Sequence, residues 1–364
     1  MIVQDIIKQL EDLAPLAYAE EFDNVGLLVG HKDMEISGVL ITLDTLPEVV
    51  DEAIATNCNL IVSFHPIIFK GLKSITGKTY VERVVQKAIK HDIAIFAVHT
   101  ALDNAFEGVN AEICNRLNLI NKSILMPQSG TVKKLTTFVP NTDAEMVRTA
   151  LFKAGGGALG NYEHCSFNSQ GIGTFEGNSE ARPAIGKPNE LKSVEETRID
   201  IVYAKHLESG ILNALFQAHP YEEVAHELFT LENKNHHIGM GMIGELEDPM
   251  SETDFLTFVK QTMKCEIIRH SKQLEHPIKK VAVLGGSGSF AISAAKAAGA
   301  DAFVTSDLKY HDFFRAENQI LLMDIGHYES EQYTKNLLAS YLKKKIPNFA
   351  VLLSKINTNP VKYK

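Results

Sequence analysis

The chain has 364 residues, a length that predicts about two domains. Its formal net charge is −9 and no basic stripe stands out, so we expect no nucleic-acid partner. No run approaches the ~20 apolar residues that a membrane helix needs, and residues 1–15 (MIVQDIIKQLEDLAP) lack the apolar stretch of a signal peptide. The 4 cysteines form no CxxC pair, which is typical of a reducing compartment. We therefore expect a cytoplasmic protein without a membrane segment.

The first third of the chain alternates strand and helix patterns. We predict buried strands at residues 37–44 (SGVLITLD), 59–63 (NLIVS) and 93–98 (IAIFAV). Apolar residues recur at helical spacing in residues 80–91, and residues 107–117 are also predicted to be helical. This β-α-β-α rhythm is typical of a mainly parallel sheet covered by helices.

The middle of the chain has a different pattern. Its order of strand, helix, two strands, helix and strand is that of the ferredoxin-like split motif, an α+β fold. Residues 171–196 are rich in Gly, Asn, Pro and Glu, which predicts a mobile loop. We therefore predict a small α+β domain at residues 128–235, inserted into one larger α/β domain at residues 1–127 and 236–364. The predicted elements are strands at 134–140, 198–203 and 224–231, a strand pair within 162–177, and helices at 143–154 and 206–218.

The last third of the chain, like the first, alternates predicted strands and helices. The predicted strands are residues 280–284, 302–305, 320–324 and 349–353, and the predicted helices are residues 290–298 and 329–342. The expected fold class is therefore α/β, with a parallel-rich sheet core built from the N-terminal and C-terminal parts of the chain.

Four segments place polar, ligand-type residues directly after a predicted buried strand. They are residues 63–66 (SFHP), 99–103 (HTALD), 306–311 (SDLKYH) and 324–331 (DIGHYESE). Ligands of open α/β sheets bind outside the carboxyl ends of the strands, so we expect these segments to meet at one site.

Two histidines and two carboxylates in these segments are candidate metal ligands, namely His65, Asp103, His327 and Glu331. Imidazole and carboxylate together suit zinc, iron, manganese or nickel. His327 and Glu331 are four residues apart at a predicted helix start, so both side chains lie on one face. A carboxylate can bridge two ions, and such a centre supplies hydroxide at neutral pH. Each residue also has a structural alternative, as Asp103 could simply cap a helix.

A glycine motif offers a competing interpretation. Residues 286–291 (GSGSFA) fit G-x-G-x-x-A between a predicted strand and a predicted helix, and Asp307 ends the next strand. This pattern is the fingerprint of a dinucleotide site and suggests a nucleotide-dependent oxidoreductase. We favour a tight strand-to-helix turn, and the amides at this helix start could also hold a phosphate.

Six motifs resemble those of the YbgI/YqfO-type, or NIF-three-like, family of dinuclear metal proteins. They are FDNVGLLVG at 22–30, HPIIFKGLKSI at 65–75, HTALDNAFEGVN at 99–110, GGSGSF at 285–290, TSDLKYHD at 305–312 and DIGHYESE at 324–331. Together they extend over nearly the whole chain.

The resemblance implies a ligand set for one or two divalent metal ions. In the family, the ligands are a His-His pair, an aspartate, and a further histidine and glutamate. The corresponding positions in this chain are Phe64 and His65, Asp103, and His327 and Glu331. Phenylalanine cannot bind a metal, so one ion should gain water or His99 instead, or bind weakly. His99 and His311 are similar to additional pocket histidines of the family, and either imidazole could shuttle protons.

The resemblance also implies an activity and an assembly. Long bacterial members carry an insertion similar to PII and CutA proteins, and residues 219–223 (HPYEE) resemble its motif. Members are typically toroidal hexamers, so a homohexamer is the implied assembly. The implied function is that of a metal-dependent hydrolase, a GTP cyclohydrolase 1 type 2 homolog, in which activated water attacks a nucleotide or related small molecule. The alternative is a non-catalytic metal-binding or small-molecule-binding scaffold or sensor.

Overall fold

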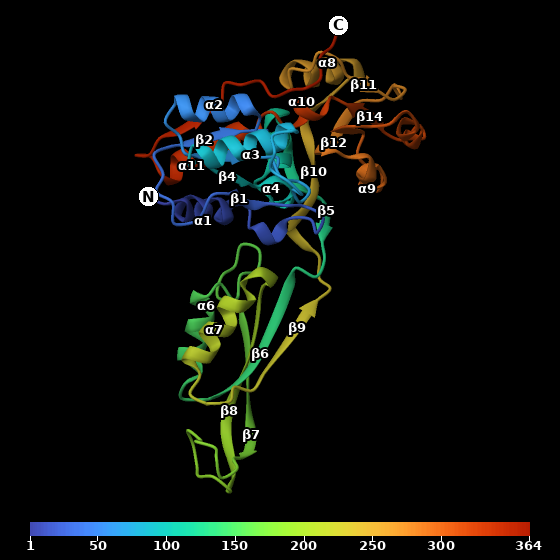
Figure 1. Ribbon diagram of the computed structural model, residues 1–364. Coiled ribbons are helices and arrows are strands. Elements are labelled where there is room, and N and C mark those ends of the chain that lie inside the picture. The colour runs from blue at the N-terminus through green and yellow to red at the C-terminus, as the bar shows by residue number, and fades with distance from the viewer. The chain divides into compact units, whose positions relative to one another are not determined.

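The computed structural model describes residues 1–364, and the chain divides into two compact units. One unit combines Met1–Pro127 with His236–Lys364, and the other is Gln128–Asn235. Both units mix helices and strands, so the predicted α/β class is confirmed at this level (Figure 1). No helix is both long and apolar enough to cross a membrane.

The first sheet of the discontinuous unit has five strands in the order β1-β4-β3-β2-β15. Its neighbours pair in parallel except β1, which runs antiparallel to β4. All four residues of β2, of β3 and of β4 are buried, as is usual for parallel strands covered on both faces. The strands are β1 (Gly26–Val29), β2 (Val39–Thr42), β3 (Leu60–Ser63), β4 (Ala94–Ala97) and β15 (Val351–Leu353).

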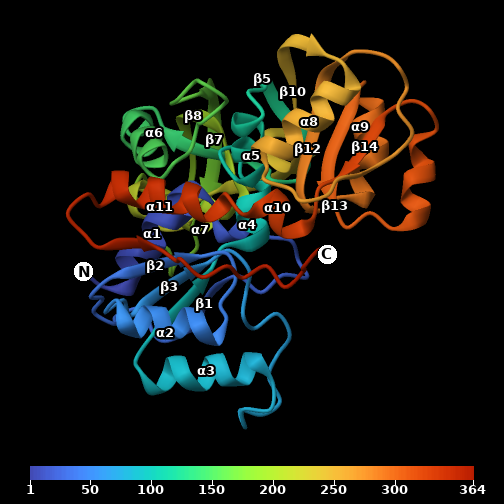
Figure 2. The same cartoon turned by 90° about the horizontal axis from the view of Figure 1, so that it is seen from above.

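Helices cover both faces of this sheet. The apolar side chains of α2 and α3 share one cluster with Leu40, Ile61 and Ile95, whereas α1 and α11 share another with Ile41 and Val62. Figure 2 shows the two pairs on opposite sides of the strands. The helices around this sheet are α1 (Val3–Leu13), a 3-10 turn η1 (Leu16–Tyr18), α2 (Pro47–Ala55), α3 (Tyr80–Lys90), α4 (His99–Asn104), α5 (Val109–Arg116) and α11 (Thr334–Lys345).

The second sheet has six strands in the order β11-β14-β13-β12-β10-β5, with β12, β13 and β14 parallel. One apolar cluster contains Ile41 and Val62 of the first sheet together with Val283 and Val304 of the second. The two ends of the chain therefore share one core. The elements are β5 (Ile120–Gln128), β10 (Asn235–Met250), α8 (Glu252–Thr262), β11 (Arg269–His270), β12 (Ile278–Ser287), η3 (Ser289–Ala291), α9 (Ile292–Ala297), β13 (Ala302–Ser306), η4 (Tyr310–Ala316), β14 (Leu321–Asp324) and α10 (His327–Glu331).

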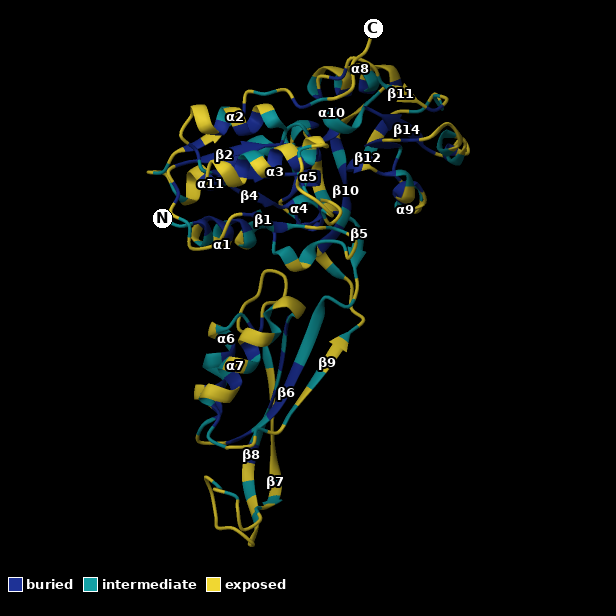
Figure 3. Ribbon diagram, in the orientation of Figure 1, coloured by how far each residue is buried: buried dark blue, intermediate teal, exposed yellow.

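The second unit is a four-stranded antiparallel sheet in the order β7-β8-β6-β9, with one helix after β6 and one after β8. Apolar residues such as Leu135, Ile199 and Leu215 form its separate core. Figure 3 shows that the β7-β8 hairpin is largely exposed at the end that carries the connection 177–190. The elements are β6 (Val132–Pro140), α6 (Ala144–Lys153), β7 (Ser166–Glu176), β8 (Leu191–Ala204), η2 (Lys205–Leu207), α7 (Glu208–Ala218) and β9 (His226–Leu231).

Three predictions about local structure need correction. The predicted loop at 171–196 is confirmed only for residues 177–190, because 171–176 and 191–196 pair as strands from Gly171–Glu196 to Glu176–Leu191. The strand pair predicted within 162–177 is the single strand β7. A hairpin whose side chains face water needs few large apolar residues, so its composition imitates that of a loop. The predicted helix at 329–342 is two helices, α10 and α11.

Candidate metal centre

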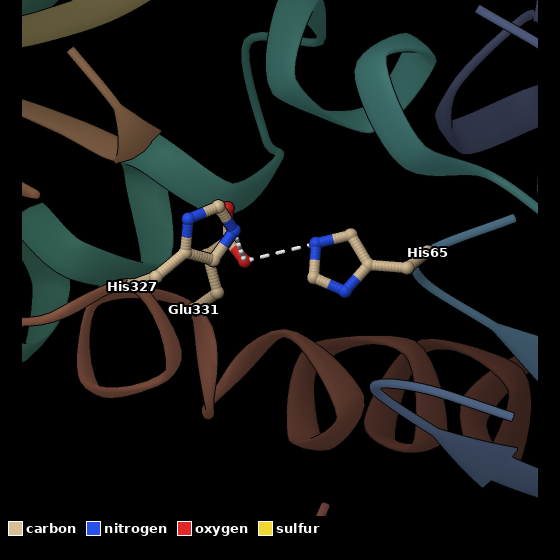
Figure 4. Close-up of side chains that lie close together, drawn as sticks. All are labelled: His65, His327 and Glu331. Atoms are coloured by element: carbon tan, nitrogen blue, oxygen red, sulfur yellow. Dashed lines mark ion pairs between the residues drawn. The ribbon is translucent and has the colours of Figure 1, made fainter. Parts of the chain in front are cut away.

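Three of the four predicted ligands converge in the discontinuous unit. One donor atom each from His65, His327 and Glu331 lies within 4.8 Å of the other two. His65 follows β3, whereas His327 begins α10 and Glu331 ends it. One helical turn separates residues four apart, which puts His327 and Glu331 on the same face of α10. Figure 4 shows both imidazoles directed toward the Glu331 carboxylate.

Each of the two imidazoles is held by a carboxylate on its far side. His65 Nδ1 is 2.8 Å from Asp44 Oδ1, and His327 Nδ1 is 2.7 Å from Asp307 Oδ2. A carboxylate at Nδ1 favours the proton on that nitrogen and leaves Nε2 as the donor atom toward a metal. The arrangement of carboxylate, imidazole and open Nε2 is therefore that of a preoriented metal ligand, present twice.

The Glu331 carboxylate joins the two Nε2 atoms. Its Oε2 lies 3.2 Å from His65 Nε2 and 3.1 Å from His327 Nε2. Although these contacts are short, Oε2 is buried and has no partner in hydrogen-bonding geometry. Two nitrogens and a buried, unsatisfied oxygen that face one point are a donor set suited to a divalent ion such as zinc.

The electrostatics of the cluster are dominated by its opposite charges. Burial lowers the pKa of His65, but contact with Asp44 and Glu331 raises it overall to about 10. Burial likewise lowers the pKa of His327, and Asp307 and Glu331 raise it overall to about 11. Burial raises the pKa of Glu331, yet the two imidazoles hold it below its usual range. The carboxylate is therefore charged at neutral pH, as a metal ligand must be.

The fourth predicted ligand, Asp103, lies beside the cluster and outside its 4.8 Å group. It comes from α4, and its Oδ1 is buried without a hydrogen-bond partner. Burial and the charge of Glu331 raise its pKa well above the usual value. A buried, unpaired carboxylate is costly, so Asp103 also has the character of a group that faces a cation.

His99 packs against His65, with a ring-centroid separation of 5.2 Å. Its Nδ1 is 2.9 Å from Asp23 Oδ1, and Asp23 Oδ2 accepts hydrogen bonds from the Thr100 hydroxyl and amide. Burial raises the pKa of Asp23, but the contacts with His99 and Thr100 lower it overall to about 2. His99 is therefore a third imidazole whose Nδ1 is held by a carboxylate.

The glycine motif contributes to the wall of the cluster. Gly286 has φ +70°, its amide donates to Ser330 Oγ, and a Cβ there would lie 2.5 Å from Glu331 Oε1. Asp307 holds His327 and also accepts a hydrogen bond from Ser287 Oγ. These contacts account for Gly286 and Asp307 without a bound dinucleotide.

A cavity of about 420 Å³ opens beside the cluster, within the size range of small-molecule sites. His65, His327 and the side chain of Arg269 line it, together with Tyr363 near the C-terminal end. The remaining predicted site residue, His311, does not line this cavity. It is exposed on η4, where its ring contacts Tyr310 and Phe314.

Comparison with known proteins gives the family. The model of the Duf34/NIF3 (NGG1p interacting factor 3) family matches residues 1–360. The chain belongs to this family. It is 39% identical over 366 residues to a Bacillus subtilis (strain 168) protein named GTP cyclohydrolase 1 type 2 homolog, covering 98% of this chain and 97% of that protein. The resemblance predicted from the six motifs is thus confirmed.

Solved structures agree with the NIF3 assignment. A Bacillus cereus protein related to NIF3 superposes with a TM-score of 0.87 at 38% identity, covering 100% of this chain and 99% of that one. A protein named ybgI has the same fold, with a TM-score of 0.59 at 14% identity, covering 99% of this chain and 100% of that one.

Phe64 is the position at which this NIF3 chain departs from the motif expected of its family. Its side chain is fully buried, and its ring centroid lies 4.9 Å from that of His65 and 5.5 Å from that of His99. The phenylalanine therefore packs against both imidazoles as an apolar wall and offers no donor atom.

Sequence reasoning missed the carboxylates that orient the imidazoles of this NIF3 chain. Asp44 ends the predicted strand SGVLITLD, so the rule applied to the other strand ends would also have indicated it. Asp23 lies in the motif at residues 22–30, where nothing in the local pattern marks it as a partner of a histidine 76 positions away. Asp307 was noticed, but for a ribose rather than for His327.

Proposed function

We propose that this NIF3-family protein binds a divalent metal ion through His65 Nε2, His327 Nε2 and the Glu331 carboxylate, with Asp103 as a further donor. The observation that carries the proposal is the convergence of three donor atoms within 4.8 Å around a buried carboxylate oxygen that lacks a hydrogen-bond partner. Zinc, iron, manganese and nickel all accept this mixture of imidazole and carboxylate. A second ion would have to use His99 or water, because Phe64 supplies no ligand.

We further propose that the site hydrolyses a nucleotide or related small molecule. A bound divalent ion would supply a water of lowered pKa. His99, held by Asp23 at Nδ1, keeps Nε2 for proton transfer, and the exposed His311, outside the cavity wall, is proposed only as a more distant proton carrier. Arg269 lines the cavity next to its ion-pair partner Asp324, so a phosphate group would have to compete with that carboxylate for the arginine or bind through the metal. The name GTP cyclohydrolase 1 type 2 homolog, borne by relatives, suggests a purine nucleotide as the first substrate to test.

A second candidate function is that of a metal-binding scaffold or sensor without turnover. The separate core of unit Gln128–Asn235 supports it, because a module with its own core can bind a ligand of its own. We propose that this unit is an inserted domain related to PII and CutA proteins, since its β-α-β-β-α-β order and sheet order are ferredoxin-like.

We also propose that the protein assembles as a homohexamer, which analytical ultracentrifugation of the full chain would test.

Metal analysis and a turnover assay on the same samples separate the candidates. We expect bound metal in the wild type and a large loss in His327→Ala, whereas the exposed histidine variant His31→Ala should keep it. Metal-dependent turnover of GTP or another nucleotide would support the hydrolase. Tightly bound metal with no turnover of any nucleotide would favour the scaffold, and a wild type that takes up no divalent ion would contradict both.

A further inference from the structure

The unit Gln128–Asn235 contains a second cavity, of about 660 Å³, that has no part in the metal cluster. Its wall comes from the end of the β7-β8 hairpin, from the connection at residues 177–190 and from the segment that follows α7. This volume is within the range of pockets that enclose small organic ligands. All of its lining residues belong to the one unit.

A buried carboxylate lies in the wall of this cavity. Glu196 is only 8% exposed, and its Oε1 accepts a hydrogen bond of 2.8 Å from the Tyr221 hydroxyl. The other oxygen, Oε2, has no hydrogen-bond or ion-pair partner. A Cβ at Gly173 would lie 2.1 Å from Oε2, so the glycine leaves the room that this oxygen occupies. Oε2 is not among the fully buried unpaired atoms, so it keeps contact with solvent and is open to a cation in the cavity.

The charges around Glu196 have one sign. Glu176, Glu180, Glu222 and Glu223 also line the cavity, and no lysine or arginine does. The ammonium of Lys192, on the neighbouring strand segment, is paired with Glu190 at 3.0 Å. Arg182 lies in the adjoining connection, where its amide donates to Glu222, but its side chain does not line the cavity. A concave wall with five carboxylates and no lysine or arginine among its lining residues attracts positively charged ligands and repels anions such as phosphates.

Aromatic side chains complete the wall. The rings of Phe175 and Tyr221 lie 5.8 Å apart at an angle of 61°, and Phe138 lines the cavity as well. Strand register places Gly171 opposite Glu196, so Gly173 and Phe175 lie on the same face of the hairpin as the carboxylate. Aromatic faces next to a carboxylate are the combination by which proteins hold alkylammonium groups.

The carboxylates do not converge as metal ligands would. The structure brings three metal-type donor atoms within 4.8 Å of one another at His65, His327 and Glu331, and no such group occurs in this cavity. A bare ion would also leave most of the volume unfilled. We therefore propose that the cavity binds an organic cation, with its ammonium group against Glu196 and its apolar body against Phe175 and Tyr221.

Isothermal titration calorimetry on the 364-residue chain tests this proposal with two cations, choline and spermidine, and with 3,3-dimethylbutan-1-ol, the uncharged isostere of choline. At least one cation should bind, and the isostere should bind at least about tenfold more weakly, since the charge contributes most of the interaction. Glu196→Gln should weaken the cation about tenfold while it keeps an acceptor for Tyr221. The matched control Glu195→Gln alters an exposed neighbour that does not line the cavity and should change nothing.

A second variant tests the proposal independently of whether Glu196→Gln folds. Phe175→Leu keeps an apolar side chain but removes the aromatic face, and it should weaken the cation about threefold with an unchanged melting temperature. Cation binding should persist in chelator, which would separate it from the metal cluster. The proposal is overturned if neither cation binds more tightly than the isostere, if both glutamate variants have the same effect, or if Mn²⁺ alone binds in a manner that depends on Glu196.

Discussion

At the scale of single residues, the candidate metal centre depends on side chains that do not themselves face the ion. Asp44 and Asp307 each hold the Nδ1 atom of one histidine, and Asp23 does the same for His99. Such partners fix the tautomer and the orientation of the imidazole, so they set the affinity of a site without being ligands.

Replacement of Asp307 by asparagine tests this role. Asp307→Asn keeps the shape of the side chain but removes the charge that supports His327, so metal affinity should fall about 10- to 100-fold. A chelator-dye competition titration would measure it, with the exposed Asp33→Asn as a control that should match the wild type. Equal affinities for all three proteins would show that His327 needs no carboxylate.

Metal binding should also be coupled to proton release. The contacts of His65 and His327 raise their pKa values to about 10 and about 11, so both imidazoles are protonated at neutral pH in the protein alone. A metal must displace these protons, and its affinity should therefore rise as the pH rises from 6 to 8. Calorimetry in buffers of different ionisation enthalpy counts the protons. An affinity that is independent of pH would contradict this account.

At the scale of secondary structure, the site residues that could be predicted from the sequence are those that directly follow a buried strand. The strands near residues 60, 94, 304 and 322 were all predicted, and His65, His99 and His327 follow three of them. Strands were predicted in parts of β7 and β8, but the pairing of residues 171–176 with 191–196 was missed, because these residues lack the apolar alternation that marks a half-buried strand. Long-range partners such as Asp23 were missed because spacing along the chain holds no information about them.

The turn after β12 offers a prediction at this scale. Gly286→Ala should lower the free energy of unfolding by more than about 1 kcal/mol, since φ is +70° and the new Cβ would meet Glu331 Oε1. Metal affinity should fall as well, because Glu331 must move. The control Gly210→Ala lies in α7 with open space around it, and it should raise stability by about 0.5 kcal/mol. Chemical denaturation measures both changes, and equal stabilities would contradict the contact.

At the scale of the whole chain, the cluster joins segments that are far apart in sequence. His65 comes from the first sheet and Glu331 from the helix after β14, and a shared apolar core holds the two sheets together. A metal that binds only this folded arrangement should stabilise it, by about 2.7 kcal/mol at a concentration 100 times its Kd. Thermal unfolding with and without a chelator measures the effect. Glu331→Gln should show a much smaller shift, and an identical shift would place the metal elsewhere.

Anomalous scattering from a crystal of the wild-type protein, grown with zinc or manganese, tests the central claim most directly. The account predicts a metal peak bonded to His65 Nε2, His327 Nε2 and Glu331, with Asp44 and Asp307 still on the far sides of the two imidazoles. A metal peak away from these residues, or no peak in metal-soaked crystals, would contradict it.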